Sequence, residues 1–255
     1  MFQTFRTCVF AGILTASTAF AAPVCVSGQT LQFYHDTYGA TGCEIGNFVA
    51  KNFDYLLVSL LTPNPVTADE IIVTANDAIG GPEFNFSANW IVANIGAIEA
   101  GIFYRLESLE GFGLTGVELS AQGSRTPGLT AAVVTEVACL GGLLDVSGFL
   151  LGGLGSVACL GGGVAANTSA ALPVGTNVNA TGTVSFFPTA FQVDILKDIA
   201  VTSILLGSAS VTNVGQQFTE EAPEPGTIGL ALGGFLVGAA AVLRKRRKDS
   251  TRNIV

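Results

Sequence analysis

The stretch from Glu83 to Trp90 alternates apolar and polar side chains, and this alternation strongly restricts how the chain can fold. Successive side chains of a β-strand point to opposite faces, so the pattern predicts a half-buried strand with one apolar face. We expect the core of the protein to contain the four residues of that face, Phe84, Phe86, Ala88 and Trp90.

Similar runs rich in Val, Ile, Thr and Phe recur along the chain, separated by turns that contain Gly, Pro or Asn. Lys, Glu and Met are scarce in the same region, which disfavours helices. About 200 residues are enough for one sizeable core. The sequence therefore predicts an all-β, β-sandwich-like body over residues 22–218. The other predicted strands are residues 48–61, 70–75, 102–106, 117–120, 178–187, 191–206 and 208–218.

The first 21 residues are typical of a secretory signal peptide. Arg6 supplies the positive charge, residues 8–20 form an apolar run, and Ala19 and Ala21 give the small-x-small pattern of a cleavage site. We expect cleavage after Ala21, because a cut one residue later would place a proline next to the bond. The chain is therefore predicted to be exported.

Four cysteines follow the signal peptide, and four cysteines allow three connectivities. Cys25 and Cys43 flank a short polar stretch. Cys139 and Cys159 occupy the same position in a Val-Ala-Cys-Leu-Gly-Gly segment that appears twice, 20 residues apart. In an oxidising compartment the local spacing favours a Cys25–Cys43 and a Cys139–Cys159 disulfide. We expect two strands, or a strand and a short helix, around the second disulfide.

The C-terminal region has three parts in a fixed order. The triplet Pro223-Glu224-Pro225 ends a polar linker predicted over residues 219–226, and the apolar run 227–243 follows. At about 1.5 Å per residue its 17 residues extend for roughly 25 Å, close to the thickness of a bilayer core. A basic cluster then favours a cytoplasmic location for the tail, residues 244–255. The cluster consists of Arg244, Lys245, Arg246, Arg247 and Lys248.

Together these three parts resemble the PEP-CTERM sorting signal of exported Gram-negative bacterial proteins. The resemblance implies an exosortase as partner, with processing near Pro223 to Pro225. It also implies anchoring in the inner membrane before processing, and a location at the cell surface or outside the cell afterwards, often beside exopolysaccharide or biofilm material. A plain single-pass membrane anchor is the alternative for residues 227–243.

The region between the two terminal segments is strongly acidic. Residues 22–225 contain four Lys or Arg and 18 Asp or Glu, a formal charge of −14. Binding to nucleic acid requires clustered positive side chains, so this class of partner is excluded. A dispersed acidic surface often serves solubility alone, although it also attracts divalent cations.

Motifs that would indicate catalysis are absent from the sequence. It contains no G-x-S-x-G, H-E-x-x-H, P-loop or EF-hand pattern. The G-x-G-x-x-G spacing at residues 111–116 precedes a predicted strand, whereas a dinucleotide site needs a helix there. His35 is the only histidine, and we expect a surface residue. Pairs of carboxylates are too numerous to select a glycosidase dyad. We therefore expect no enzyme, no cofactor and no metal site.

The sequence favours an exported structural protein of the cell surface or extracellular matrix, associated with exopolysaccharide. The alternative is a displayed module that binds a glycan or Ca²⁺. In that alternative, exposed aromatic side chains beside acidic residues would form the binding surface, and the candidates are Tyr34, Tyr38 and Tyr55.

Overall fold

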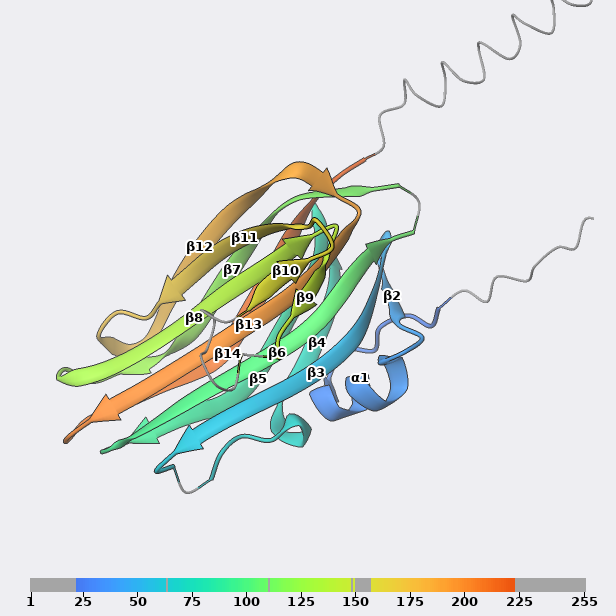
Figure 1. Ribbon diagram of the computed structural model, residues 1–255. Coiled ribbons are helices and arrows are strands. Elements are labelled where there is room, and N and C mark those ends of the chain that lie inside the picture. The colour runs from blue at the N-terminus through green and yellow to red at the C-terminus, as the bar shows by residue number, and fades with distance from the viewer. Residues whose placement is uncertain (1–21, 63, 110, 148, 150–156, 223–255) are drawn as a thin grey trace, which may run out of the picture.

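The computed structural model describes residues 22–62, 64–109, 111–147, 149 and 157–222. These residues form two six-stranded antiparallel sheets, one two-stranded hairpin and a short α-helix (Figure 1). The predicted all-β sandwich is therefore confirmed. The predicted signal peptide, sorting motif, apolar segment and basic tail lie outside the described residues. Within the described ranges, no helix has the length and apolar character that crossing a membrane requires.

The first sheet has the strand order β1-β4-β5-β14-β7-β12, and the second has the order β11-β8-β13-β6-β3-β2. The strands of the first sheet are β1 (Gln29–Thr30), β4 (Ile72–Ala78), β5 (Gly81–Ala93), β7 (Gly113–Arg125), β12 (Gly175–Ala190) and β14 (Ser208–Glu221). The strands of the second sheet are β2 (Cys43–Ile45), β3 (Phe48–Leu60), β6 (Gly96–Ser108), β8 (Leu129–Leu140), β11 (Val164–Ala171) and β13 (Gln192–Ile204). The hairpin consists of β9 (Leu143–Asp145) and β10 (Ala158–Leu160).

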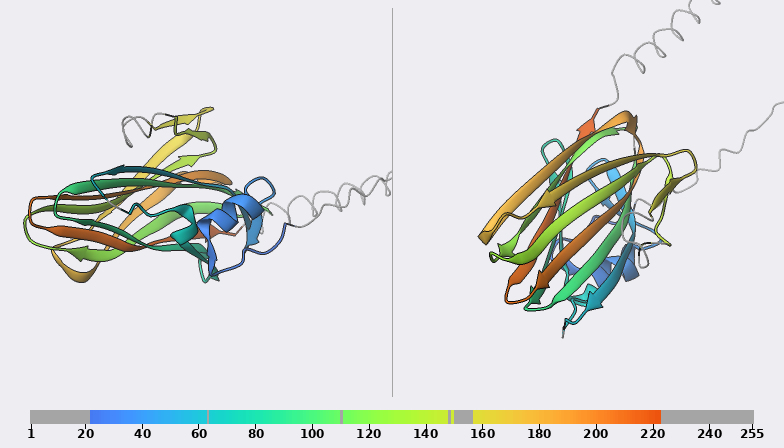
Figure 2. Two further views of the ribbon diagram at one scale, coloured as in Figure 1. Left: turned by 90° about the horizontal axis from the view of Figure 1, so that it is seen from below. Right: turned by 60° about the vertical axis from the view of Figure 1, so that its left-hand side comes forward.

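The two sheets are stacked as layers, and the β9–β10 hairpin stands on the outer side of the second sheet (Figure 2). Consecutive strands often belong to different layers: the chain passes from β5 to β6, and from β13 to β14, between the sheets. Such consecutive strands do not pair by backbone hydrogen bonds, and apart from their connecting loop they contact each other through side chains in the core. Contacts across the core therefore decide how the layers are aligned.

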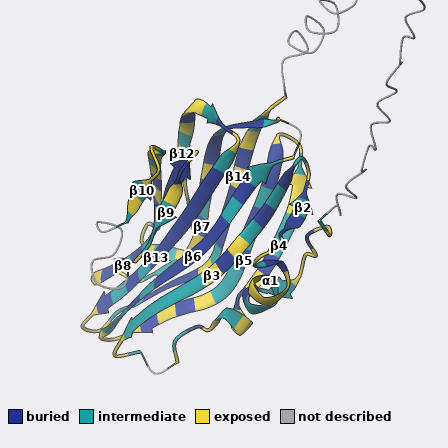
Figure 3. Ribbon diagram, turned by 45° about the vertical axis from the view of Figure 1, so that its right-hand side comes forward, coloured by how far each residue is buried: buried dark blue, intermediate teal, exposed yellow. Residues whose placement is uncertain are grey.

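Alternation along each strand places one row of side chains in the core between the layers (Figure 3). Phe84, Phe86 and Trp90 of β5 are each 0% exposed, as the pattern predicts, while Ala88 is partly buried and packs against the same core. These rings meet others that come from the opposite sheet. The ring centroids of Phe84 and Tyr104 are 5.1 Å apart, and those of Phe84 and Phe53 are 6.0 Å apart.

A polar cluster lies inside this aromatic core. Lys197 of β13 donates from Nζ to Oε2 of Glu136 on the neighbouring β8, at 2.5 Å. The other carboxylate oxygen of Glu136 accepts from Nε2 of Gln216 on β14, at 2.7 Å, and Oη of Tyr104 donates to Oε1 of Gln216. None of these four side chains is more than 2% exposed. The cluster thus links both sheets with hydrogen bonds that satisfy each buried group.

The linker predicted from residue 219 is wrong in its first part, because β14 continues to Glu221. Its register with β7 extends to the Glu221–Gly113 pair, and Gln216 and Phe218 both face the core. Polar residues at alternate positions resemble a linker in the sequence, yet here they form the solvent-facing side of β14, which lies between β5 and β7 in the sheet.

Several strands are longer than the alternating runs that predict them. β6 extends the predicted 102–106 on both sides, β7 extends 117–120, and the start of the predicted strand 70–75 is instead the end of a 3₁₀ turn, Ala68–Glu70. The two strands expected around the second disulfide are the end of β8 and β10, whereas the first part of β8 and the whole of β11 were not predicted. They are rich in Ala and Thr, so hydrophobic alternation is weak and pairing with neighbouring strands decides their conformation.

The polar stretch between Cys25 and Cys43 contains an α-helix, α1 (Leu31–Tyr38), which the all-β prediction does not include. Thr30 caps this helix by accepting from the backbone N–H of Phe33. Tyr34 and Tyr38 lie on its buried face, and Oη of Tyr34 donates to the carbonyl of Val26. The prediction that these two tyrosines are exposed is therefore wrong, because they follow the period of a helix.

Both predicted disulfides are present in the structure. Cys25–Cys43 joins the segment before α1 to β2, and Cys139–Cys159 joins the end of β8 to β10. Disulfides persist in oxidising compartments, so these bonds support an extracytoplasmic location.

The two-layer core predicts a large difference between buried and exposed leucines. Replacing the fully buried Leu119 by Ala is expected to lower the free energy of unfolding by about 2–5 kcal/mol, because a cavity remains. The control is Leu206→Ala, since Leu206 is 96% exposed; its effect should stay within about 0.5 kcal/mol. Denaturant unfolding measures both, and equal effects would contradict the assigned orientation of β7.

Candidate binding groove

A second, smaller apolar cluster lies on the outer face of the second sheet. Phe103 and Leu196 point outward from β6 and β13, and Phe149 covers them, with its ring centroid 6.1 Å from that of Phe103. Gly101 leaves room for this ring, because a Cβ there would lie 2.9 Å from Phe149. The outer face is therefore partly covered, and the cover includes the β9–β10 hairpin through Leu144.

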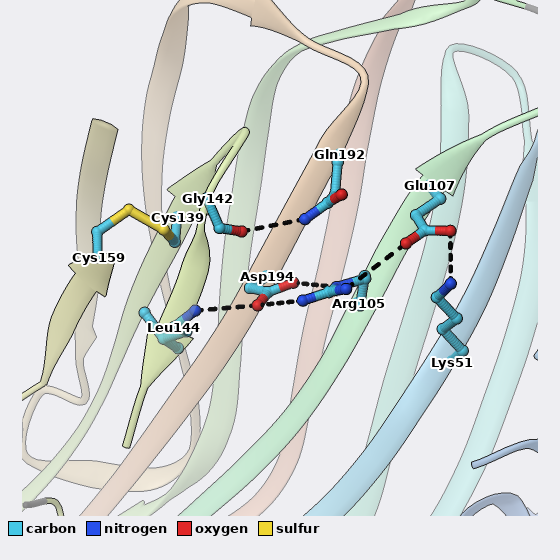
Figure 4. Close-up of polar contacts among 9 residues, drawn as sticks. All are labelled: Lys51, Arg105, Glu107, Cys139, Gly142, Leu144, Cys159, Gln192 and Asp194. Atoms are coloured by element: carbon cyan, nitrogen blue, oxygen red, sulfur yellow. Dashed lines mark hydrogen bonds and ion pairs between the residues drawn. A yellow bond between two sulfur atoms is a disulfide. The ribbon is translucent and has the colours of Figure 1, made fainter. Parts of the chain in front are cut away.

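The disulfide Cys139–Cys159 and several hydrogen bonds attach this hairpin to the sheet (Figure 4). Oδ2 of Asp194 accepts from the backbone N–H of Leu144 at 3.0 Å, and Nε2 of Gln192 donates to the carbonyl of Gly142. Both side chains come from β13. The hairpin is thus fixed along the strand that also carries the core Lys197.

A row of ion pairs crosses the same face, as Figure 4 shows. Arg105 binds Asp194 through two nitrogens, with Nε at 2.5 Å from Oδ1 and Nη2 at 2.8 Å from Oδ2. Glu107 lies on the other side of Arg105 and also accepts from Nζ of Lys51. The hydrogen bond to Asp194 raises the pKa of the Arg105 guanidinium above its ordinary value. A bidentate pair of this kind holds its atoms in a defined geometry.

A β-bulge in β3 adds two more polar groups to this face. The register between β3 and β6 shifts between Lys51 and Asp54, and Asn52 adopts a positive φ of 58°. The extra residue changes which face later side chains occupy, so Phe53 enters the core while Asn52 and Asp54 both point outward. Bulges commonly direct side chains in this way beside functional sites.

The bulge, the ion pairs and the hairpin together line an open groove of about 320 Å³. Its polar side chains come from β3, β6 and β13, and its apolar side chains come mainly from the hairpin. The lining residues are Asn52, Asp54, Phe103, Tyr104, Arg105, Leu143, Leu144, Val146, Asp194 and Ile195. A volume near 300 Å³ with mixed lining is typical of small-ligand sites.

Asp198 lies four residues after Asp194 and shares the outer face of β13 with it. Asp198 is only 7% exposed, and among the described residues its Oδ1 has no hydrogen-bond partner. Burial, together with the negative charge of Glu99, raises the pKa of Asp198 to about 7. Ionising this carboxyl is therefore unfavourable in the folded protein.

The aromatic residues predicted to bind a glycan do not meet in this groove. Tyr34 and Tyr38 are in the core, and Tyr55 is half-buried, with Oη donating to the carbonyl of Val66 and accepting from Nε1 of Trp90. His35 is a surface residue as expected, with a half-exposed side chain. In the part of the chain that the structure describes, no three His, Cys, Asp or Glu residues are grouped to hold a metal ion.

Only part of the groove can be recognised from the sequence. Arg105 is one of four basic residues in the body, and Asp194 belongs to an alternating strand, so both could be noticed as outward-facing charges. Their pairing, and their proximity to Asn52 and Leu144, depends on strand order and on the bulge. Neither of these can be read from local spacing.

No family model matches the chain, and no curated protein matches it. Among solved structures, the enzymatically active domain of bacteriophage CBA120 tailspike protein 4 is 18% identical with a TM-score of 0.32, over 76% of this chain and 21% of that one. The carbohydrate-binding module TmCBM61, solved with β-1,4-galactotriose, is 8% identical with a TM-score of 0.32, over 76% and 99%. A structure of carbohydrate-binding modules from the β-sandwich superfamily is 10% identical with a TM-score of 0.25, over 73% and 64%. These likenesses are too distant to show a function for this chain.

The raised pKa of Asp198 predicts a pH-dependent stability. Its ordinary pKa of 3.8 applies to the unfolded chain, and the folded value is about 7, so the folded state holds this proton more tightly. Stability should therefore fall as the pH rises from about 4 to about 7, by at most about 4 kcal/mol from this group. In the Asp198→Asn variant this decrease should disappear, whereas at pH 4 the two proteins should be similarly stable. Urea unfolding at both pH values measures this, and an unchanged slope in the variant would contradict it.

Proposed function

We propose that this protein is an exported cell-surface protein whose β-sandwich body binds a neutral glycan in the groove between β3, β6, β13 and the β9–β10 hairpin. The observation that carries the proposal is the convergence of amide, carboxylate and guanidinium groups beside an apolar wall in one open groove. Sugars present hydroxyl groups around a ring with apolar C–H faces. A site with both polar partners and apolar surface matches that chemistry.

The polar groups of the groove differ in how far their hydrogen-bonding capacity is already used. Arg105 and Asp194 are largely occupied by each other and are held in a fixed geometry. Asn52 and Asp54 are exposed at the bulge, where their side chains are accessible to hydroxyl groups. The fixed pair would orient a ligand, and the accessible pair would provide most of the new hydrogen bonds.

Charge favours a neutral ligand over an acidic one. Around the groove, the negative groups Asp54, Glu107 and Asp194 outnumber Lys51 and Arg105. The body as a whole carries a formal charge of −14. Such a surface repels acidic polysaccharides at low ionic strength. At about 0.1 M salt this repulsion is largely screened beyond about 10 Å.

The sorting signal defines where this groove would act. Only Ala222 separates the end of β14 from Pro223, the first residue of the Pro-Glu-Pro triplet. If residues 227–243 are inserted in the inner membrane, the sandwich is therefore held close to the bilayer until an exosortase releases it. Both disulfides fit this extracytoplasmic route.

The groove proposal predicts which variants lose binding. On an array of neutral and acidic oligosaccharides, the protein should bind neutral ones, and Asp54→Ala and Arg105→Met should each weaken the affinity about tenfold, which corresponds to one lost hydrogen bond to a charged group. The control is Glu118→Ala, an exposed acid on β7 of the other sheet, which should bind like the wild type. Calorimetry on the best array ligand gives the affinities. Equal losses of affinity in all three variants, or no binding to any oligosaccharide, would disprove the assignment of the groove as a glycan-binding site.

The sorting signal makes a separate prediction that does not depend on the groove. Replacing Pro223, Glu224 and Pro225 by Ala should leave membrane insertion intact, because a bilayer responds to apolar length and flanking charge. Maturation should fail, because a processing enzyme requires its own peptide motif. Alanine substitutions at residues 251–253 serve as the control and should mature normally. Intact mass of the surface-released protein decides this: a wild-type C-terminus still at Val255 would leave only the plain anchor.

A further inference from the structure

The buried cluster in the sandwich core places an amine and a carboxamide on the two oxygens of one carboxyl group. The two oxygens of Glu136 accept separately, Oε2 from Nζ of Lys197 at 2.5 Å and Oε1 from Nε2 of Gln216 at 2.7 Å. The amine and the amide are therefore held against one carboxyl group. Lys197 and Glu136 belong to the second sheet and Gln216 to the first, so the hydrogen bond from Gln216 to Glu136 spans the two layers.

The carbonyl side of the Gln216 amide is also held. Oη of Tyr104 donates to Oε1 of Gln216. Burial raises the pKa of the Tyr104 phenol well above its ordinary value, so this group remains a donor. A donor directed at a carbonyl oxygen stabilises the negative charge that develops there when a nucleophile attacks the carbonyl carbon.

The surroundings favour the uncharged forms of both ionisable groups. Lys197 is 0% and Glu136 is 1% exposed. Burial lowers the pKa of the Lys197 amine and raises the pKa of the Glu136 carboxyl, while their mutual attraction opposes both shifts. A lysine becomes nucleophilic only as the neutral amine, and desolvation is a common means of producing it.

We propose that Lys197 and Gln216 form an intramolecular amide bond across the core, with Glu136 transferring the proton. Nζ of Lys197 attacks Cδ of Gln216, a new Nζ–Cδ bond forms, and the Cδ–Nε2 bond breaks. Glu136 accepts a proton from the amine and donates a proton to the departing nitrogen, which leaves as ammonia. No oxidant, metal or cofactor is required, and Glu136 ends as it began.

This bond would give the sandwich a covalent link between its layers. It would join β13 to β14, which are consecutive in the chain but lie in different sheets. Both disulfides lie elsewhere, at the N-terminal segment and at the hairpin. A link at Lys197 and Gln216 would therefore close the central part of the fold, which neither disulfide constrains.

A purely structural ion pair explains the same cluster less completely. A buried pair is often replaceable by apolar residues without loss of stability, so burial alone gives little reason for a lysine in this position. The pair also leaves unexplained why the amide of Gln216 is fixed at both its nitrogen and its oxygen by the same cluster. In the amide-forming arrangement each of the four side chains has a defined role.

Peptide mass mapping of the full-length protein, isolated from its native compartment and reduced before digestion, tests the proposal directly. We expect one branched peptide containing Lys197 and Gln216, lighter than the sum of its two parts by about 17 Da, the mass of ammonia. Fragmentation locates the branch. Two separate peptides of unchanged mass would overturn the proposal. A loss of about 18 Da that joins Lys197 to Glu136 would also overturn it, because water then leaves and Gln216 is not the acyl donor.

Two variants of the full chain separate the roles of the residues. Lys197→Arg keeps a long side chain with N–H donors beside Glu136 but provides no usable nucleophile, so the branched peptide should be absent. Glu136→Gln keeps the size of the side chain but cannot transfer the proton, so the peptides should again be separate. Circular dichroism establishes that each variant is folded. A branched peptide in folded Glu136→Gln would contradict the assigned role of Glu136, and one in Lys197→Arg would contradict that of Lys197.

Discussion

The hydrogen-bonded cluster of Tyr104, Gln216, Glu136 and Lys197 is the interaction on which the alignment of the two sheets most depends. Apolar side chains in a core attract one another without a preferred direction, whereas this cluster requires four groups to meet in one geometry. Displacing one sheet along the other would separate Gln216 from Glu136 and Tyr104 and leave buried polar groups without partners, which is costly. The aromatic rings around the cluster contribute buried apolar surface, and the cluster determines how the two sheets are aligned.

The outer face of the second sheet uses the same strands for a different purpose. On β13, Lys197 faces the core while Asp194 faces the groove, and on β6 the neighbours Tyr104 and Arg105 are divided in the same way. A groove built on strands that are fixed from behind is held rigidly, which reduces the entropy lost on binding. The bulge at Asn52 then provides additional outward-facing polar groups, and the disulfide-attached hairpin provides an apolar wall that a flat sheet lacks.

Local patterns predicted the features that depend on neighbouring residues. Alternation identified Phe84, Phe86 and Trp90 as core, and short spacing identified both disulfides. The helical spacing of Leu31, Tyr34 and Tyr38 is present in the sequence, but the all-β prediction does not use it and places two buried tyrosines at the surface. Features that join distant segments could not be predicted. The pairing of Glu136 with Lys197, the burial of Gln216 and the groove all depend on strand order and on a bulge that shifts the register.

The most direct measurement of the central claim is hydrogen exchange of the protein with and without the neutral oligosaccharide that binds it best. Ligand in the groove should slow exchange in the segments that line it, around Asn52 to Asp54 and Leu143 to Val146, because these include exposed backbone near the bulge and the hairpin. The outer face of the first sheet should exchange at an unchanged rate. Protection confined to that other sheet, or no protection at saturating oligosaccharide, would contradict the assignment of the groove as the binding site.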